Sequence, residues 1–329
     1  MRNLFYLAKP SYGGWVTFTV HLSKKYNFNL YKIGNRTEIL KSGIIKKRPY
    51  GYDVNYQNIS KEDILKYSNH LITAIDKHHY KYLSFFPDNT SIVIHDPTEV
   101  KGKSCQMLIE NLKRFNVITI RKTVQKYLKN TLNIESTFLH HPFYQYQKTN
   151  SNNKYKNVSI SRLDFDKHTD LILKANYHLD NINKINLYGA KNDLYVFHHL
   201  TNKLNLPLNN YHGSFKKCFI QLNDILSNSK YVIDLSAIKY DGGGTQYTFL
   251  EAIYHDCVLI LNEKWINYNL DKTKEIKCES IFENNVNCLI INNEYDIINI
   301  LKNSKDINIE QIINNSKKLL EPHINVDWN

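Results

Sequence analysis

The chain has 329 residues, of which 42% are hydrophobic, and it carries a formal net charge of +12. This apolar content provides a full core and excludes a chain that is disordered throughout, and the length is typical of two domains. No apolar run approaches membrane-spanning length, and the start "MRNLFYLAKPSYGG" is too short and too polar for a signal peptide. Two interpretations of the charge are open: a polyanionic partner such as nucleic acid or an anionic membrane surface, or the Lys-rich composition that an AT-rich genome favours.

The cysteines indicate a reducing compartment. Their number is odd and none forms a CxxC pair: Cys105, Cys218, Cys257, Cys278 and Cys288. We therefore expect free thiols in a cytoplasmic protein, and no zinc site or other metal site.

Strand-like and helix-like segments alternate through the first half of the chain. A helix is expected to begin at Trp15, and helical patterns cover 105–115 and 123–130. Apolar runs predict strands at 3–8, 70–75, 91–95, 116–120 and 136–142. This alternation is typical of a mostly parallel sheet that is covered by helices.

The same alternation restarts after a polar segment. "YQYQKTNSNNKYK" (144–156) has no hydrophobic period and is the best linker candidate. Strands are expected at 157–161, 184–189, 231–236, 257–261 and 287–291, and helices at 168–179, 192–203, 219–227, 247–255, 294–303 and 308–320. The fold class is therefore α/β, with two doubly wound, Rossmann-like domains at 1–150 and 151–329. We expect the last helix to cross back to the first domain, and ligands to bind in an interdomain cleft at the carboxyl ends of the strands.

A glycine-rich loop separates a strand from a helix in "YDGGGTQYTFLEA" (240–252). Bare backbone at Gly243 and Gly244, followed by Thr245 and Gln246 at a helix N-terminus, suits a phosphate or a sugar. Glu251 follows one turn into the helix, where its carboxylate could accept hydrogen bonds from ribose hydroxyls. The pattern is not a P-loop because no Gly-Lys-Ser/Thr follows, and the structural alternative is a flexible turn.

Two cations stand at the corresponding place after an earlier strand, in "SISRLDFDKHTDLILKA" (159–175). Arg162 follows the strand and Lys167 precedes the next helix, so both could neutralise a departing diphosphate. Taken alone, two solvated surface cations explain the same residues.

These two segments, in this order and about eighty residues apart, resemble retaining GT-B glycosyltransferases that use nucleotide sugars. The resemblance covers 157–262 best. It implies that Arg162 and Lys167 hold the donor diphosphate, while the glycine loop and Glu251 hold the sugar and the ribose. One departure concerns the family's usual second glutamate: Gly243 stands at that position, and the nearest acid is Asp241.

Within that family, "QYTFLEA" is most similar to the DNA α-glucosyltransferases of T-even phages. The stretches at 9–22 and 91–99 are compatible with the same group. This resemblance implies UDP-glucose as donor, hydroxymethylated bases in double-stranded DNA as acceptor, and no tightly bound cofactor. Two alternatives stay open: the same donor chemistry on a glycan, lipid or protein acceptor, and a non-enzymatic nucleic-acid-binding protein.

The acceptor residues are sought at strand ends of the first half. His95 and Asp96 end a predicted strand, where the carboxylate could align or deprotonate a hydroxyl and the imidazole could bind the sugar or the acceptor. The structural alternative is a turn cap, since "HDPT" is also good turn chemistry. Gly13 and Gly14 follow the first strand and either admit a donor or acceptor to a helix N-terminus or close a turn.

Overall fold

The computed structural model describes most of the chain. The described residues are 2–10, 13–33, 56–149, 151, 154–214, 218–236, 244–265, 280–303, 305 and 307–329. Gly243 and Asp241 from the glycine-rich segment lie outside these ranges, as does Cys278.

The first half of the chain forms a seven-stranded sheet in the order β3-β2-β1-β4-β5-β6-β7. All neighbouring strands are parallel. The strands are β1 (Asn3–Leu7), β2 (Asn29–Ile33), β3 (Gln57–Ile59), β4 (His70–Ile75), β5 (Ser91–Ile94), β6 (Asn116–Thr119) and β7 (Thr137–Phe138). The α-helices of this half are α1 (Gly14–Tyr26), α3 (Gln106–Leu112) and α4 (Lys122–Leu132). Short 3-10 helices lie between strands at η2 (Lys61–Lys66), η3 (Tyr80–Phe85), η4 (Pro97–Val100) and η5 (Lys103–Cys105).

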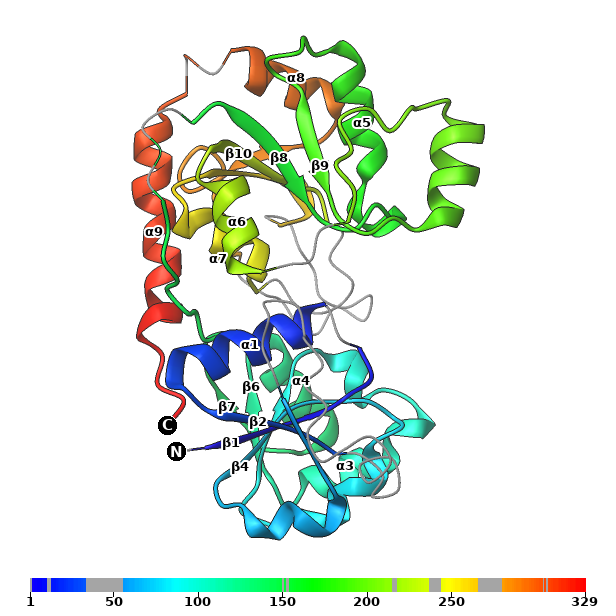
Figure 1. Cartoon of the computed structure of the whole chain (residues 1–329), viewed down its shortest axis with the longest axis vertical. Helices are drawn as coiled ribbons and strands as arrows, with labels where there is room; N and C mark the ends of the chain where they lie inside the picture. Colours follow the sequence, from blue (N-terminus) through cyan, green and yellow to red (C-terminus); the bar gives the residue numbers. More distant parts are fainter. Residues whose placement is uncertain are drawn as a thin grey trace.

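The second half forms a five-stranded parallel sheet in the order β12-β11-β10-β8-β9. Its strands are β8 (Lys156–Ile160), β9 (Ile185–Tyr188), β10 (Ser229–Asp234), β11 (Val258–Asn262) and β12 (Leu289–Ile291). The longer helices are α5 (Thr169–His178), the π-helix η7 (Tyr195–Lys203), α6 (Phe219–Leu226), α7 (Tyr247–Tyr254), α8 (Glu294–Lys302) and α9 (Ile309–Asn325), and the short 3-10 helices are η6 (Phe165–Lys167) and η8 (Glu263–Trp265). The predicted α/β class with two Rossmann-like halves is confirmed (Figure 1).

Both sheets bury both faces, which explains the near-continuous apolar runs in the sequence. Along β1, Leu4 and Tyr6 belong to one apolar cluster, and Phe5 and Leu7 belong to another. The cluster with Leu4 continues into the second half, where it includes Leu250 of α7. One core therefore runs between the two sheets, and α1 contacts α7 within it.

The strand predicted at 136–142 is much shorter than expected. Only Thr137–Phe138 forms β7, because the backbone beyond it makes hydrogen bonds with the C-terminal part of the chain. The His140 carbonyl accepts from Trp328 Nε1 at 3.1 Å, and the His141 carbonyl bonds His323 Nδ1 at 2.9 Å. The C-terminal end of α9 and the tail beyond it thus pack against the first half of the chain (Figure 1).

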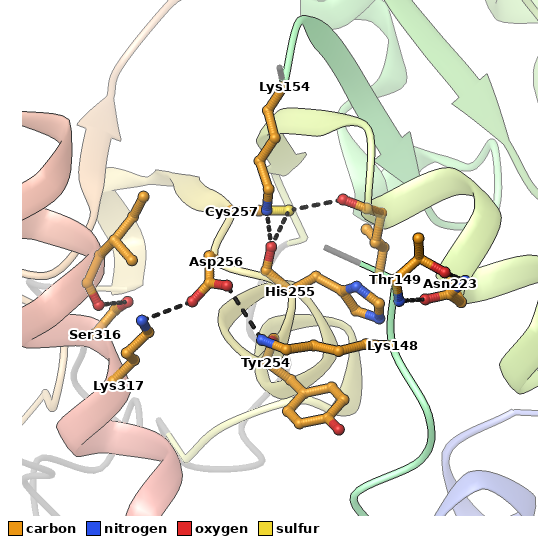
Figure 2. A network of polar contacts seen from close by, with 12 residues as sticks. Lys148, Thr149, Lys154, Asn223, Tyr254, His255, Asp256, Cys257, Ser316 and Lys317 are labelled. Carbon is orange, nitrogen blue, oxygen red and sulfur yellow. Dashed lines mark hydrogen bonds and ion pairs between the residues drawn. The ribbon is translucent and has the colours of Figure 1, made fainter. Parts of the chain in front are cut away.

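Side chains of the predicted linker, residues 144–156, make polar contacts with the second half of the chain (Figure 2). Lys148 Nζ donates to the Tyr254 carbonyl at 2.8 Å and lies 3.1 Å from Asp256 Oδ2. Lys317 of α9 binds the other oxygen of Asp256 at 2.8 Å. Lys154 donates to the His255 carbonyl. Since these cations gather at the C-terminal end of α7, they complement the negative end of its dipole.

Candidate donor and acceptor site

The two predicted donor cations lie at the carboxyl edge of the second sheet. Arg162 follows β8, is exposed, and pairs with Asp164 at 3.1 Å and Asp166 at 3.2 Å. Lys167 donates to Ser236 Oγ at 2.7 Å, and Ser236 lies two residues beyond the end of β10. Since β8 and β10 are neighbours in the sheet, both cations stand where parallel sheets bind ligands.

The Ser236 hydroxyl is held in turn by Asp234, the last residue of β10. Asp234 Oδ1 accepts from both the Ser236 N–H, at 3.0 Å, and the Ser236 hydroxyl. Asp234 is 2% exposed and Ser236 is fully buried. The chain Asp234–Ser236–Lys167 therefore fixes the position of the ammonium group, while the exposed Arg162 is held by the two carboxylates of its own loop.

The described end of the glycine loop enters α7 beside the first half of the chain. Gln246 is the N-cap residue of α7 and makes no side-chain cap, and Thr245 is buried. A Cβ built on Gly244 would lie 3.2 Å from Arg121 Cγ, so the bare backbone here makes room for an arginine of the other half.

Glu251 lies inside the contact between α1 and α7. Its side chain is 1% exposed, and Oε1 is 3.6 Å from Nε2 of the fully buried His21. His21 Nδ1 accepts the Tyr144 N–H at 3.0 Å, so the neutral ring carries its hydrogen on Nε2, facing Glu251. The His21 ring stacks on Tyr247 with centroids 4.4 Å apart. In this arrangement the carboxylate faces the other half of the protein, and the ribose role remains a prediction.

The predicted acceptor residues follow β5. His95 is buried, and its Nε2 bonds the Thr73 carbonyl at 2.7 Å; burial lowers its pKa to about 4. Asp96 caps η4, with Oδ1 accepting the Thr98 N–H at 2.8 Å. Asp96 Oδ1 therefore acts as the turn cap, and the His95 imidazole is held by its bond to Thr73, so its role toward sugar or acceptor remains a prediction. No partner of Asp96 Oδ2 occurs within the described ranges, so a role toward an acceptor remains a prediction.

Gly13 and Gly14 lie between β1 and α1. Gly13 is the N-cap of α1 and has φ +103°, a conformation that L side chains rarely adopt. A Cβ built on either glycine meets no heavy atom of the described residues within 4 Å. The geometry fits a turn that also leaves the start of α1 accessible.

Three further residues at the site were not predicted from the sequence. Buried Glu99 accepts from Trp15 Nε1 at 2.9 Å and the His95 N–H at 3.2 Å, and burial raises its pKa well above the usual value. The sequence pattern that could have indicated Glu99 is "DPTE", whose spacing is typical of a helix cap. Arg121 follows the apolar run of β6 directly, the same position that singled out Arg162. A Cβ on Gly189 would lie 1.9 Å from the Ser161 carbonyl oxygen, so only glycine lets the backbone before Arg162 lie this close.

Two cavities lie away from these residues. One of about 730 Å³ is lined by Arg2, Ser136 and Asn329, near the amino ends of the first sheet. Within the described ranges, no cluster of His, Cys, Asp and Glu could hold a metal ion. None of the described helices combines the length and the hydrophobicity needed to cross a bilayer.

Comparisons with known proteins show which solved structures share this fold. No protein-family model and no curated sequence matches the chain. Among solved structures, HepE from Anabaena in complex with UDP is 12% identical, with a TM-score of 0.67 over 98% of this chain and 95% of HepE. An α-glucosyltransferase in complex with UDP and a 13-mer DNA is 12% identical, with a TM-score of 0.67 over 97% of this chain and 95% of that enzyme. TarM from S. aureus is 16% identical, with a TM-score of 0.53 over 78% of this chain and 54% of TarM. The chain therefore has the GT-B fold that these glycosyltransferases share, as the sequence resemblance predicted.

Proposed function

We propose that this protein is a retaining hexosyltransferase that moves glucose from UDP-glucose to the hydroxymethyl group of a modified pyrimidine in DNA. The observation that carries the donor half of this proposal is the position of Arg162 and Lys167. Both stand at the carboxyl edge of the second sheet, as a diphosphate would require. The fold neighbours support the donor class, since HepE has been solved with UDP-glucose.

In the proposed reaction, the acceptor oxygen forms a bond to the anomeric carbon of the sugar while the bond from that carbon to UDP breaks. Lys167 and Arg162 stabilise the negative charge that develops on the leaving diphosphate. Backbone N–H groups at Gly244 and Gln246 and the start of α7 add positive potential. Asp96 receives the hydroxyl proton or aligns the hydroxyl, using the oxygen that does not cap η4.

The charge distribution supports a polyanionic acceptor. Residues 1–150 contain 23 Lys and Arg but only 10 Asp and Glu, whereas residues 151–329 contain 20 and 21. A compositional bias of the genome would act on both halves, so it does not explain an excess confined to one. The half that carries Asp96 is therefore the half that suits a phosphate backbone. A structure of an α-glucosyltransferase in complex with UDP and a 13-mer DNA containing an HMU base supports the same acceptor class.

The decisive experiment measures transfer directly. The protein is incubated with UDP-glucose or other nucleotide sugars, together with hydroxymethylated or unmodified DNA, and the nucleosides are weighed by mass spectrometry after digestion. We expect one hexose on hydroxymethylated pyrimidines and none on unmodified DNA, with the product greatly reduced in Lys167→Ala.

Two other outcomes would be equally clear. Consumption of the donor with transfer to a glycan or lipid, and none to modified DNA, would overturn the acceptor assignment and leave the donor site standing. No turnover and no binding of any nucleotide sugar would overturn the proposal as a whole.

A further inference from the structure

The outer face of α4 carries cations without acids. Lys122 and Lys126 are exposed and one helical turn apart, so they share a face. The helix contains no Asp or Glu, and its remaining lysine, Lys129, pairs with Glu135 at 3.1 Å. Lys101, at the end of η4, extends this face, since its Nζ lies 4.9 Å from the ring of Tyr127 on α4. We call Lys101, Lys122 and Lys126 the α4 basic face.

This face begins at the candidate site. Arg121 is the N-cap of α4, and its side chain packs against Gly244 of the donor loop. The 3-10 helix that Asp96 caps contacts α4 as well. A chain of anionic groups lying on the α4 basic face would therefore lead to the proposed acceptor carboxylate on one side and to the donor loop on the other.

Several cations of the second half are held in ion pairs instead. Arg162 pairs with two carboxylates of its own loop, Lys174 lies 3.7 Å from Asp170, and Lys317 lies 2.8 Å from Asp256. Within the described part of the chain, the lysines of the α4 basic face form no such ion pair. Their charge is thus available to an external anion without the loss of an ion pair within the protein.

We propose that the α4 basic face binds the phosphate backbone of the DNA acceptor and guides the modified base to the site. This inference rests on the proposed function for its choice of DNA, and on the charges of α4 for its location. The binding is sequence-independent, because ammonium groups contact phosphates and leave base recognition to the site itself. Removing one ammonium group that binds a phosphate should lower the salt dependence of binding by about one counterion.

The test compares two double charge reversals of equal net charge. Lys122→Glu/Lys126→Glu alters the α4 basic face, and Lys302→Glu/Lys318→Glu alters exposed lysines of α8 and α9 as a matched control. Affinity for a short DNA duplex is measured by fluorescence anisotropy between about 50 and 200 mM salt. We expect the α4 variant to bind at least about tenfold more weakly at low salt, with a slope of log Kd against log salt reduced by about two, while the control stays near wild type.

The outcomes separate this inference from the proposed function. Equal decreases in affinity for both variants would show that only net charge matters and would overturn the α4 assignment. Unchanged DNA affinity with weakened binding to phosphatidylserine vesicles would assign the face to a membrane and also overturn it. Binding of UDP-glucose, measured by calorimetry on the same variants, should be unchanged, so a failure of the donor site would be seen independently. Circular dichroism melting confirms that each variant is folded.

Discussion

The two halves of the molecule build similar parallel sheets from similar buried strands, yet they use charge in different ways. In the second half, acids and bases are nearly equal in number, and cations such as Arg162 and Lys317 are paired locally. In the first half, acids are scarce, and Lys122 and Lys126 on the outer face of α4 have no carboxylate partner among the described residues. A small, defined ligand suits the first arrangement, whereas an extended polyanion suits the second.

The contact between the halves shows that they are not independent. Their shared apolar core passes through α1 and α7, and it encloses the polar pair His21 and Glu251. An interface this apolar resists the free relative motion that is usual between domains. The comparison therefore predicts chemistry that divides between the halves, and a donor site whose properties depend on both.

The largest expected effect concerns the acceptor half. Asp96→Ala should lower transfer by about 10³-fold with donor binding retained, because a positioned base contributes about 10²–10⁴-fold. Asp96→Asn is the matched control: its amide oxygen can still accept the Thr98 N–H, but the side chain cannot take a proton. Steady-state rates on modified DNA check both variants. If Asp96→Asn transfers glucose at the wild-type rate, Asp96 does not take the hydroxyl proton.

The donor half should show a slightly smaller effect. Arg162→Ala and Lys167→Ala should each reduce kcat by roughly 10²-fold or more, since each removes a charge that stabilises the leaving group. Folding should change little, because Arg162 is exposed and its partners are within its own loop. Lys174→Ala, in the same half but paired with Asp170 on α5, serves as control. Wild-type turnover in either site variant would remove that residue from the donor site.

Glu251 tests whether the donor site depends on both halves. Glu251→Gln preserves the volume of the side chain and should raise the KM for UDP-glucose by about tenfold if the carboxylate anchors ribose. Because that carboxylate is 1% exposed and faces His21, donor binding would then require α7 to shift relative to α1.

Calorimetric titration with UDP distinguishes this role from a purely structural one. If Glu251 serves only the contact between the helices, Glu251→Gln and His21→Phe should both lower the melting temperature while the affinity for UDP stays constant. That result would mean that a residue other than Glu251 contacts the ribose.

Much of the fold could be predicted from the sequence, because strands buried on both faces appear as continuous apolar runs. The runs at 70–75 and 91–95 predicted β4 and β5 to within one residue. The strands β2 and β3 toward one edge of the first sheet were missed, since "NLYKI" and "QNI" are short and mix polar with apolar residues. Positions near an edge bury less, so they impose a weaker pattern.

The candidate site was only partly predictable, for a different reason. Arg162 and Lys167 were predicted because Arg162 directly follows a strand and Lys167 directly precedes the next helix in the sequence. His21 lies in the middle of α1, and its role depends on Tyr144 and Glu251, which are more than a hundred residues away. Such contacts arise only when the two halves pack together, so no local pattern indicates them.

The smallest expected effect lies where the two halves touch, at Gly244 and Arg121. A Cβ at position 244 would lie 3.2 Å from Arg121 Cγ, tighter than an ordinary contact, but the arginine side chain is flexible and can give way. Gly244→Ala should therefore reduce transfer only about threefold, equivalent to ~0.6 kcal/mol. In an Arg121→Ala background the obstacle is gone, and the same substitution should have no further effect. Transfer rates of the wild type, both single variants and the double variant form a cycle that measures this coupling. Strictly additive effects would mean that the donor loop and the acceptor half act independently, contrary to the packing of Arg121 on Gly244.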